Sequence, residues 1–230
     1  MQMHLRKANQ RGHADHGWLD TNHTFSFASY RDPRYMGFGH LRVINEDRVA
    51  PGRGFGTHSH RNMEIISYVV DGGLEHKDTI GTGSVIRPGE VQVMSAGKGV
   101  AHSEYNASAT DPVHFLQIWV LPAEGNTRPR YDQKAFDTSA RGARLVVSGD
   151  GRDGSLQVGQ DLDLYRLLLD AEQTVTHAVA RERVWLQVIR GELEVNGVLL
   201  QAGDGLAIVE TSEVAVKASA DVEALLFDLL

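Results

Sequence analysis

The sequence predicts an all-β protein built from two barrels in tandem. Three observations lead to this prediction: the apolar runs are short, turn-forming residues separate them, and a polar stretch near the middle of the chain divides them into two groups. Periodic helical patterns are scarce. Many short strands joined by regular turns are typical of β-sandwiches and β-barrels.

Seven runs carry the strand prediction, because each is short and rich in β-branched or large apolar residues. In chain order they are Leu41–Ile44, Met63–Val70, Val91–Met94, Phe115–Leu121, Leu164–Leu169, Val184–Ile189 and Ala224–Leu230. The turn signals between them are Asp71–Gly73, Pro88–Gly89, Gly97–Gly99, Asn196–Gly197 and Gly203–Gly205. Asn196–Gly197 has the composition of a tight two-residue hairpin turn.

A polar stretch between Leu121 and Ser155 contains two prolines and a Gly/Asp-rich segment, and we interpret it as the crossing between barrels. The expected organisation is an N-terminal domain over 1–130, a linker over 131–152 and a C-terminal domain over 153–230. A weak internal alignment supports the duplication. It pairs Asp71–Glu75 with Arg190–Glu194, and Pro88–Glu90 with Ala202–Asp204.

Composition narrows the classes of function. The 230 residues are 41% hydrophobic and 23% charged, as in an ordinary globular protein, and no apolar run has the roughly 20 residues of a membrane-spanning helix. The absence of cysteine excludes disulfides and thiolate ligands. The net charge of -7 argues against direct binding of nucleic acid. The basic start lacks the apolar stretch of a signal peptide, so a cytoplasmic location is expected.

Two short motifs among the 11 histidines combine metal-binding residues at strand spacing. In His58–His60 and in His102–Glu104, the outer side chains are two residues apart and project from the same face of a strand. If the two strands are neighbours, the four groups converge. Imidazole and carboxylate together suit Fe, Mn, Ni, Co, Cu or Zn, whereas a closed structural zinc site usually uses cysteine. The alternative interpretation is that these are ordinary surface or core histidines.

These motifs resemble those of the cupin superfamily. Gly52, His58, His60 and Glu64 follow the first cupin motif, with the closing glycine one residue late at Gly72, and His102–Asn106 fits the end of the second. Gly97 stands where cupins usually have proline. This departure resembles the pirins, to which further segments are similar: Arg11–Leu19, His23–Phe27, Leu41–Asp47, Met94–Glu104, Arg152–Leu156 and Gln160–Asp161.

The pirin resemblance implies two tandem cupin (jelly-roll) barrels and one divalent metal ion. The implied ligands are His58, His60, His102 and Glu104, with Fe(II) the first expectation and Mn, Ni, Co, Cu or Zn left open. Glu64 is expected to support the structure rather than to ligate. The internal alignment carries His58 onto His177, His60 onto Val179 and Glu64 onto Arg183, so we expect no metal in the second barrel.

The resemblance also implies an activity, since bacterial pirin-like proteins are associated with quercetinase activity. We expect a dioxygenase that cleaves flavonols such as quercetin with O₂ and releases CO, with Glu104 as the proton acceptor and the chain a monomer. One alternative is a non-catalytic metal-binding redox sensor or transcriptional co-regulator, like eukaryotic pirins. Another is a cupin enzyme of a different reaction class.

The walls of the substrate pocket are expected on strands near the metal. The candidates are Phe25, Phe55, Met94, Phe115, Gln117 and Trp119. A second metal cluster at His13, His16 and His23 is the less favoured interpretation, because their loop context favours hydrogen-bonded structural histidines. His76 and His114 are placed near the barrel mouth in structural roles.

Overall fold

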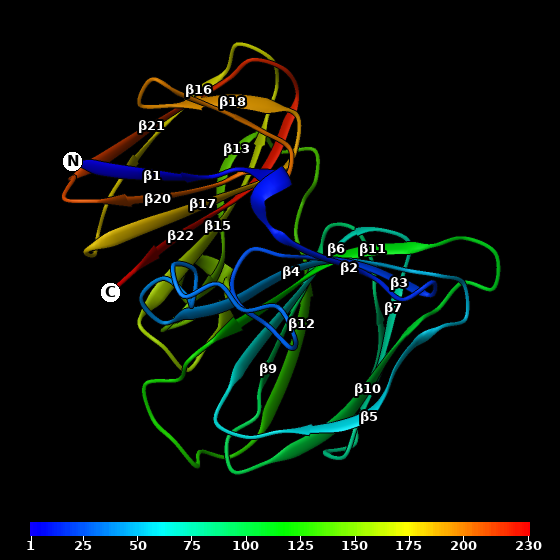
Figure 1. Cartoon of the computed structure of the whole chain (residues 1–230). Coiled ribbons are helices and arrows are strands. Elements are labelled where there is room, and N and C mark those ends of the chain that lie inside the picture. Colours follow the sequence, from blue (N-terminus) through cyan, green and yellow to red (C-terminus); the bar gives the residue numbers. More distant parts are fainter. The chain divides into compact units, whose positions relative to one another are not determined.

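A computed structural model describes all 230 residues and confirms the all-β prediction (Figure 1). The chain forms two compact units. Unit 1 contains Met1–Arg11, Asp137–Ser155 and Asp161–Leu230, and unit 2 contains Gly12–Phe136 and Leu156–Gln160. Neither of the two short 3₁₀ helices, η1 (Ala8–Gln10) and η2 (Arg152–Gly154), is long or apolar enough to cross a membrane.

Unit 2 holds two sheets. The larger has the order β12-β9-β6-β11-β4-β3-β2 and the smaller the order β5-β10-β7-β8, and the pairings within them are antiparallel. The strands of this unit are β2 (Gly12–Asp15), β3 (Leu19–His23), β4 (Leu41–Val49), β5 (Gly54–His60), β6 (Glu64–Asp71), β7 (Leu74–Asp78), β8 (Gly83–Ile86), β9 (Glu90–Ser95), β10 (Val100–Asn106), β11 (Val113–Val120), β12 (Arg130–Ala135) and β14 (Leu156–Gln157).

Unit 1 repeats this plan. One sheet runs β1-β20-β17-β22-β15-β13 and the other runs β16-β21-β18-β19. Its strands are β1 (Gln2–Arg6), β13 (Gly142–Ser148), β15 (Leu162–Leu169), β16 (Thr174–Ala178), β17 (Arg183–Arg190), β18 (Glu192–Val195), β19 (Val198–Gln201), β20 (Gly205–Val209), β21 (Glu213–Ala218) and β22 (Val222–Leu229). The β18–β19 hairpin turns at Asn196 and Gly197, both with positive φ, as the Asn-Gly pair predicts.

The extents of the two units differ from the expected domains. Met1–Arg11 belongs to unit 1 because β1 pairs along β20. The segment expected to be a linker contains two strands, β12 at the edge of the large sheet of unit 2 and β13 beside β15 in unit 1. β12 is an edge strand of polar composition, and an exposed edge strand lacks the apolar alternation by which a strand is recognised in a sequence. In β13 only the short run Leu145–Val147 is apolar and buried.

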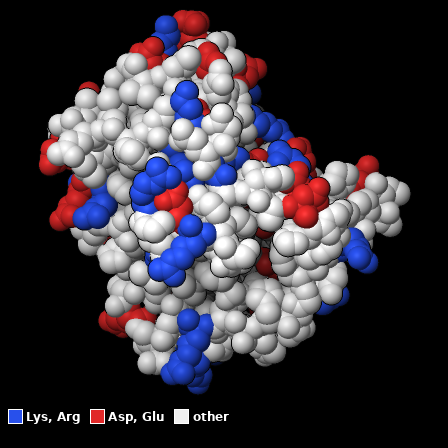
Figure 2. Space-filling view, in the orientation of Figure 1, with Lys and Arg blue, Asp and Glu red and all other residues white.

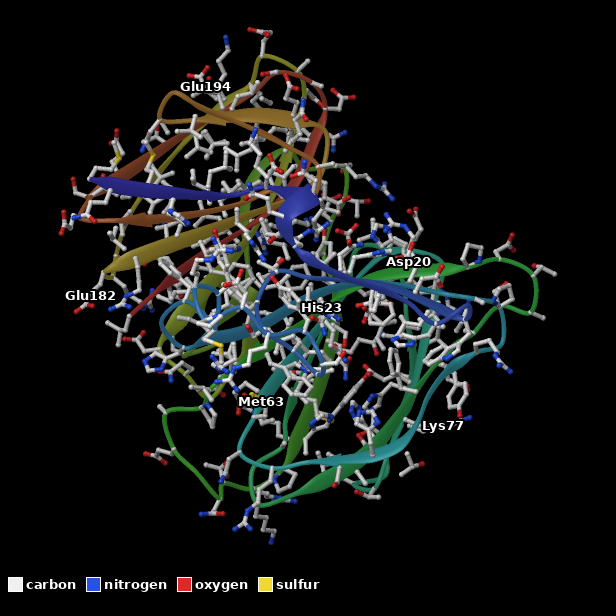
Figure 3. The ribbon with its side chains drawn as sticks, in the orientation of Figure 1. Asp20, His23, Met63, Lys77, Glu182 and Glu194 are labelled. Carbon is white, nitrogen blue, oxygen red and sulfur yellow. The ribbon has the colours of Figure 1, made fainter.

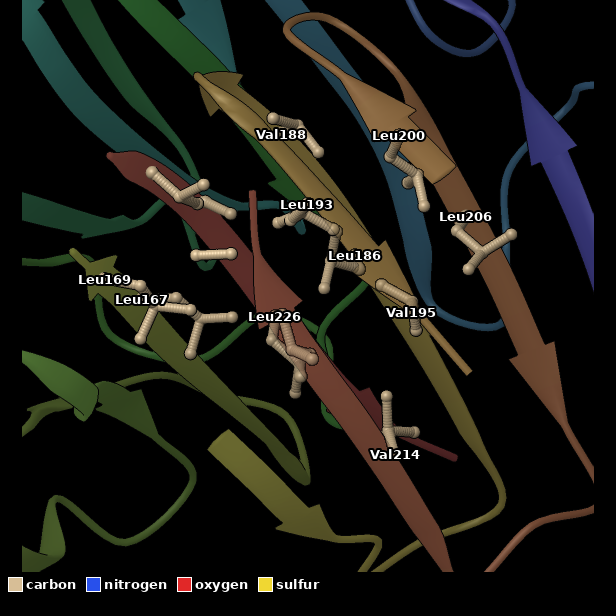
Figure 4. Close-up of a cluster of buried hydrophobic side chains, with 14 of the residues drawn as sticks. Leu167, Leu169, Leu186, Val188, Leu193, Val195, Leu200, Leu206, Val214 and Leu226 are labelled. Carbon is tan, nitrogen blue, oxygen red and sulfur yellow. The ribbon is translucent and has the colours of Figure 1, made fainter. Parts of the chain in front are cut away.

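The interior of unit 1 is mainly apolar, with the buried carboxylate of Asp228 at one end of β22. Leucine, valine and isoleucine side chains from both sheets fill it, and Leu186, Val214 and Leu226 lie among them (Figure 4). The interior of unit 2 is layered instead. Two separate apolar clusters, one around Val69 and Phe115 and the other around Ile65 and Met94, lie on either side of a row of polar residues.

This polar row crosses the large sheet of unit 2 from strand to strand. In register order it is His23, Asn45, Gln117, Ser67, Gln92 and Gln133. Five of the six are buried, and buried polar side chains require hydrogen-bonding partners. The row therefore forms a polar layer between the two apolar clusters. On the outer surface, Figure 2 shows basic and acidic side chains interspersed over the visible face.

Candidate metal centre

Three histidines converge where β5 and β10 lie side by side. The register places His102 directly opposite His58, and His60 follows two residues along the same face of β5. The Nε2 atoms of His58 and His102 are 3.1 Å apart, and the ring centroids of the three histidines are 4.5 to 4.9 Å apart. One nitrogen from each ring lies within 4.8 Å of the others, so a single ion can reach all three.

A β-bulge sets the position of Glu104. Between His102 and Glu104 the register with β5 shifts, so that Glu104 pairs with Phe55 rather than with Gly56. Bulges of this kind re-aim side chains beside functional sites. Glu104 forms a second group of potential ligands with His76 and His102, so His102 is common to both groups.

The Glu104 carboxylate is buried, and side chains of the large sheet hold it in position. Gln117 Nε2 donates to Oε2 at 2.7 Å. The Ser67 hydroxyl lies 3.4 Å from Oε1 and shares its single proton with Gln117 Oε1, which is closer at 2.9 Å. Burial raises the pKa of Glu104 to about 7, although these two hydrogen bonds oppose the shift. No basic side chain is among its partners. A cation at the histidines would therefore stabilise a carboxylate that the chain itself leaves uncompensated.

A chain of side chains fixes the proton of His102. Hydrogen bonds from His76 and from the backbone N–H groups of Thr82 and Ile80 hold the pKa of Asp78 below its usual value, against the effect of burial. The ionised Asp78 accepts a hydrogen bond from His76 Nε2 at 2.9 Å. The lone pair of neutral His76 is then on Nδ1, which lies 3.4 Å from His102 Nδ1 and accepts a hydrogen bond from it; Gln92 Nε2 lies at the same distance from this atom. His102 Nε2 consequently keeps its lone pair toward His58.

His58 is oriented in a similar way. Its Nδ1 lies 2.8 Å from the carbonyl oxygen of Gly56, which can only accept, so the proton is on Nδ1 and Nε2 is available. Burial, aided by the neighbouring histidines, lowers the pKa of His60 to about 4 and that of His102 to about 3. Both rings are therefore neutral at pH 7 and can ligate without first losing a proton. The site is a metal-binding His/Glu site whose donor set fits a borderline divalent ion.

An aromatic cavity opens onto this centre. It encloses about 680 Å³, part of it open to solvent, and His58 and Glu104 lie in its wall. Of the expected pocket residues, Phe55, Gln117 and Trp119 line it. Trp119 contacts Phe27 and His60 edge-on, with ring centroids 5.4 and 4.9 Å apart.

The other three expected pocket residues do not line the cavity. Met94 and Phe115 have no exposed surface, because they fill the two apolar clusters above and below the polar row, and Phe25 is 1% exposed. The expectation missed Thr21, Asn45 and Asp47, which do line it. A signal was present in the strand Leu41–Val49. Its inward face is otherwise apolar, and Asn45 and Asp47 interrupt that face at a spacing of two.

Three other histidines of unit 2 have structural partners. On β3 and its neighbours, His13 Nε2 lies 2.8 Å from Asp20, and His23 Nδ1 lies 2.8 Å from Asn45; Figure 3 labels Asp20 and His23. His114 lies 2.9 Å from Glu46, and His16 lines the cavity.

Glu64 lies on the face of β6 opposite to Ser67, away from the metal centre. Its carboxylate accepts from Ser95 Oγ at 2.6 Å and from the Gly159 N–H at 2.9 Å. These contacts attach the segment Leu156–Gln160 to the sheet, which is a structural role.

In unit 1 the matching positions are filled differently. His177 pairs with Val214 just as His58 pairs with His102, and the register between β16 and β21 runs without a shift. The His177 ring instead donates from Nε2 to the buried carboxylate of Asp228 at 2.9 Å. Valine at 179 and at 214 thus replaces two of the histidines, and both groups of three potential ligands lie in unit 2.

Comparison with known proteins agrees with this architecture. Residues 4–120 match the family described as Pirin, and residues 145–229 match the quercetinase C-terminal cupin domain. A protein named quercetin 2,3-dioxygenase from Escherichia coli K12 is 53% identical over 228 residues, which cover 99% of this chain and 98% of that protein.

Two crystal structures of a relative have the same fold. YhhW from Escherichia coli is 51% identical and superposes with a TM-score of 0.97, covering 100% of this chain and 98% of that one. A structure of the bacterial pirin YhhW in complex with nickel(II) gives a TM-score of 0.95 at 51% identity, with 99% of each chain covered. These matches, over the unit with the candidate metal centre and over the second barrel alike, show that the chain belongs to the pirin family, as a protein of two cupin domains.

Proposed function

We propose that the protein is a metal-dependent dioxygenase that cleaves flavonols such as quercetin with O₂ and releases CO. The observation that carries the proposal is the aromatic cavity that opens directly onto His58 and Glu104. Phe27, Phe55 and Trp119 offer faces and edges on which a planar aromatic substrate packs. The 53% identical relative named quercetin 2,3-dioxygenase supports the same activity.

The metal ligands in this proposal are His58, His60, His102 and Glu104. A divalent ion bound there supplies Lewis acidity, which lowers the pKa of a hydroxyl that it ligates. The donor set accommodates both Fe(II) and Ni(II), and we propose Fe(II). Metal analysis of protein purified from a medium that contains both metals decides between them.

Glu104 is the proton acceptor in this proposal. Its Oε2 stays fixed by Gln117 at 2.7 Å, whereas Oε1 has only the long 3.4 Å contact with Ser67. Oε1 is therefore the atom free to take the proton of the flavonol 3-hydroxyl. Ser67 and Gln117 belong to the polar row, so the large sheet orients the base while the small sheet supplies the histidines.

The test is oxygen-dependent turnover of metal-reconstituted protein. Apo-protein is loaded separately with Fe(II), Mn(II), Co(II), Ni(II), Cu(II) and Zn(II), and quercetin absorbance, O₂ consumption and CO release are recorded together. The proposal predicts one CO released for each O₂ consumed with at least one of these metals, and no turnover by His60→Ala. Absence of turnover with every metal contradicts it and leaves a non-catalytic metal-binding role.

A further inference from the structure

Three polar atoms in the cavity wall are buried without a hydrogen-bonding partner. They are Thr21 Oγ1, Asp47 Oδ1 and Trp119 Nε1. Nearly all buried polar groups in folded proteins are satisfied, and an unsatisfied group costs about 1–3 kcal/mol. The residues that carry these three atoms line one cavity, so a molecule that enters it and shifts their side chains can supply the missing partners.

Thr21 and Asp47 form a pair. They lie directly opposite each other on β3 and β4, two residues along their strands from the polar row. Their side chains are 3% and 4% exposed. Burial raises the pKa of Asp47 to about 7, and the nearby carboxylate of Glu104 adds to this, while the adjacent Thr21 hydroxyl opposes it without reaching good hydrogen-bond geometry. In either protonation state Asp47 Oδ1 can accept a hydrogen bond.

The surroundings of the pair are apolar and aromatic. Leu19 and Phe55 line the same cavity, and the Phe55 ring contacts Trp18 edge-on at 5.3 Å between centroids. A polar pair set in such a wall matches an aromatic ring that carries a hydroxyl, since a phenol donates to one oxygen and accepts from another. A carboxylate ligand is disfavoured, because it would face Asp47 and Glu104 at close range.

Trp119 Nε1 lies on the other side of the polar row. Its strand, β11, carries Phe115 opposite Asp47, and Trp119 is four residues further on, roughly 13 Å along the strand at about 3.3 Å per residue. That span is comparable with the long axis of a three-ring aromatic molecule. When the middle ring of such a molecule faces Gln117 and Glu104, one end reaches the Thr21–Asp47 pair and the other end reaches Trp119 Nε1.

We propose that Thr21 and Asp47 form a hydroxyl-binding subsite that selects polyhydroxylated aromatic ligands over unsubstituted ones. The identity of the ligand as a flavonol rests on the proposed function, whereas the subsite itself rests on the geometry of the two side chains. Trp119 Nε1 donates to an oxygen at the opposite end of the same ligand.

The experiment compares two substrates in metal-loaded full-length protein. Quercetin carries hydroxyls on both outer rings, and 3-hydroxyflavone carries only the 3-hydroxyl. The measured quantity is the ratio of their kcat/KM values. We expect Thr21→Val to lower this ratio by at least about tenfold, because a site built to bind a hydroxyl discriminates strongly against its absence. Asp47→Asn, whose amide keeps an accepting oxygen, should lower it less.

The matched control is Asn22→Ala, whose side chain projects from the opposite face of β3 and does not line the cavity. It should keep the wild-type ratio. Thermal unfolding establishes that each variant is folded; Thr21→Val preserves shape and volume, so it carries the test if Asp47→Asn does not fold. An unchanged ratio in folded Thr21→Val, with quercetin still turned over, overturns the subsite and leaves the proposed function intact.

Failure of the proposed function is distinguishable from failure of the subsite. If wild-type protein turns over neither flavonol, anaerobic titration calorimetry with the same two compounds decides the subsite. Binding of quercetin at least about tenfold tighter than 3-hydroxyflavone, with the difference lost in Thr21→Val, supports it. Equal binding of the two compounds to the wild type overturns it.

Discussion

Replacing Glu104 and Glu64 by glutamine separates a metal ligand from a structural carboxylate. Both residues are 2% exposed, both accept two hydrogen bonds, and both have a pKa raised by burial. The two side chains face in different directions. Glu104 faces the histidines from β10, whereas Glu64 faces away from them on β6 and holds the N–H of Gly159.

The magnitudes follow from these surroundings. Two unit charges 4 Å apart attract by about 4 kcal/mol at an effective dielectric constant of 20, so loss of the buried Glu104 charge should cost a bound cation up to about 4 kcal/mol. That corresponds to up to about 1000-fold in Kd. Glu104→Gln should not destabilise the metal-free protein, because it removes an uncompensated buried charge. Glu64→Gln should leave the Kd unchanged and lower the free energy of unfolding by about 1–3 kcal/mol.

The assays are metal titration of the apo-protein by competition with a chromophoric chelator and urea unfolding of the same metal-free samples. We expect Glu104→Gln to raise the Kd for the metal without lowering the free energy of unfolding. We expect Glu64→Gln to lower the free energy of unfolding without changing the Kd. Equal loss of metal affinity in both variants would refute the assignment of Glu104 as the carboxylate ligand and of Glu64 as structural.

Three further predictions concern the residues around the two barrels. His76→Gln should weaken metal binding about 10- to 100-fold, measured by the same titration, because it removes the acceptor that orients His102; unchanged affinity would contradict this role. His177→Ala should leave the metal content at one ion per chain by elemental analysis, and a loss of metal would place a site in unit 1. Burial raises the pKa of Asp228, but hydrogen bonds from His177 and from the Ala180 N–H, with the positive charge of Arg181, outweigh burial and lower that pKa. The stability that the ionised carboxylate contributes is therefore present above its unfolded pKa of about 4 and is lost as pH falls through the lower folded pKa. Asp228→Asn should therefore be less stable at pH 7 by about 1–3 kcal/mol in urea unfolding and lose less stability than the wild type on acidification below pH 4; equal acid sensitivity would count against this account.

The candidate ligands could be found from the sequence because their pattern is local. Two residues at a spacing of two on one strand share a face whatever the rest of the fold does, and the family motif adds the pairing of the strands. The bulge beside Glu104 was not predictable, since it depends on how β5 and β10 slip past each other. Hydrogen bonds across strands, such as that of Gln117 with Glu104, are likewise a result of register.

The pocket and the domain limits depended on long-range pairing. Met94 and Phe115 have the residue types of a pocket wall, but they occupy the apolar layers on either side of the polar row, and only the register reveals which layer a residue joins. Thr21 and Asp47 meet across a separation of 26 positions in sequence, and β1 pairs with a strand near residue 207. No local pattern specifies such partners.

The central claim is that one metal ion is bound by both motifs of unit 2. Anomalous diffraction from crystals of metal-loaded protein, recorded at the absorption edge of the metal, tests it most directly. The account predicts one strong peak within about 2.0–2.2 Å of His58 Nε2, of a nitrogen of His60, of His102 Nε2 and of a Glu104 oxygen. A peak ligated by His76 in place of His58 and His60, or a second peak beside His177, would contradict it.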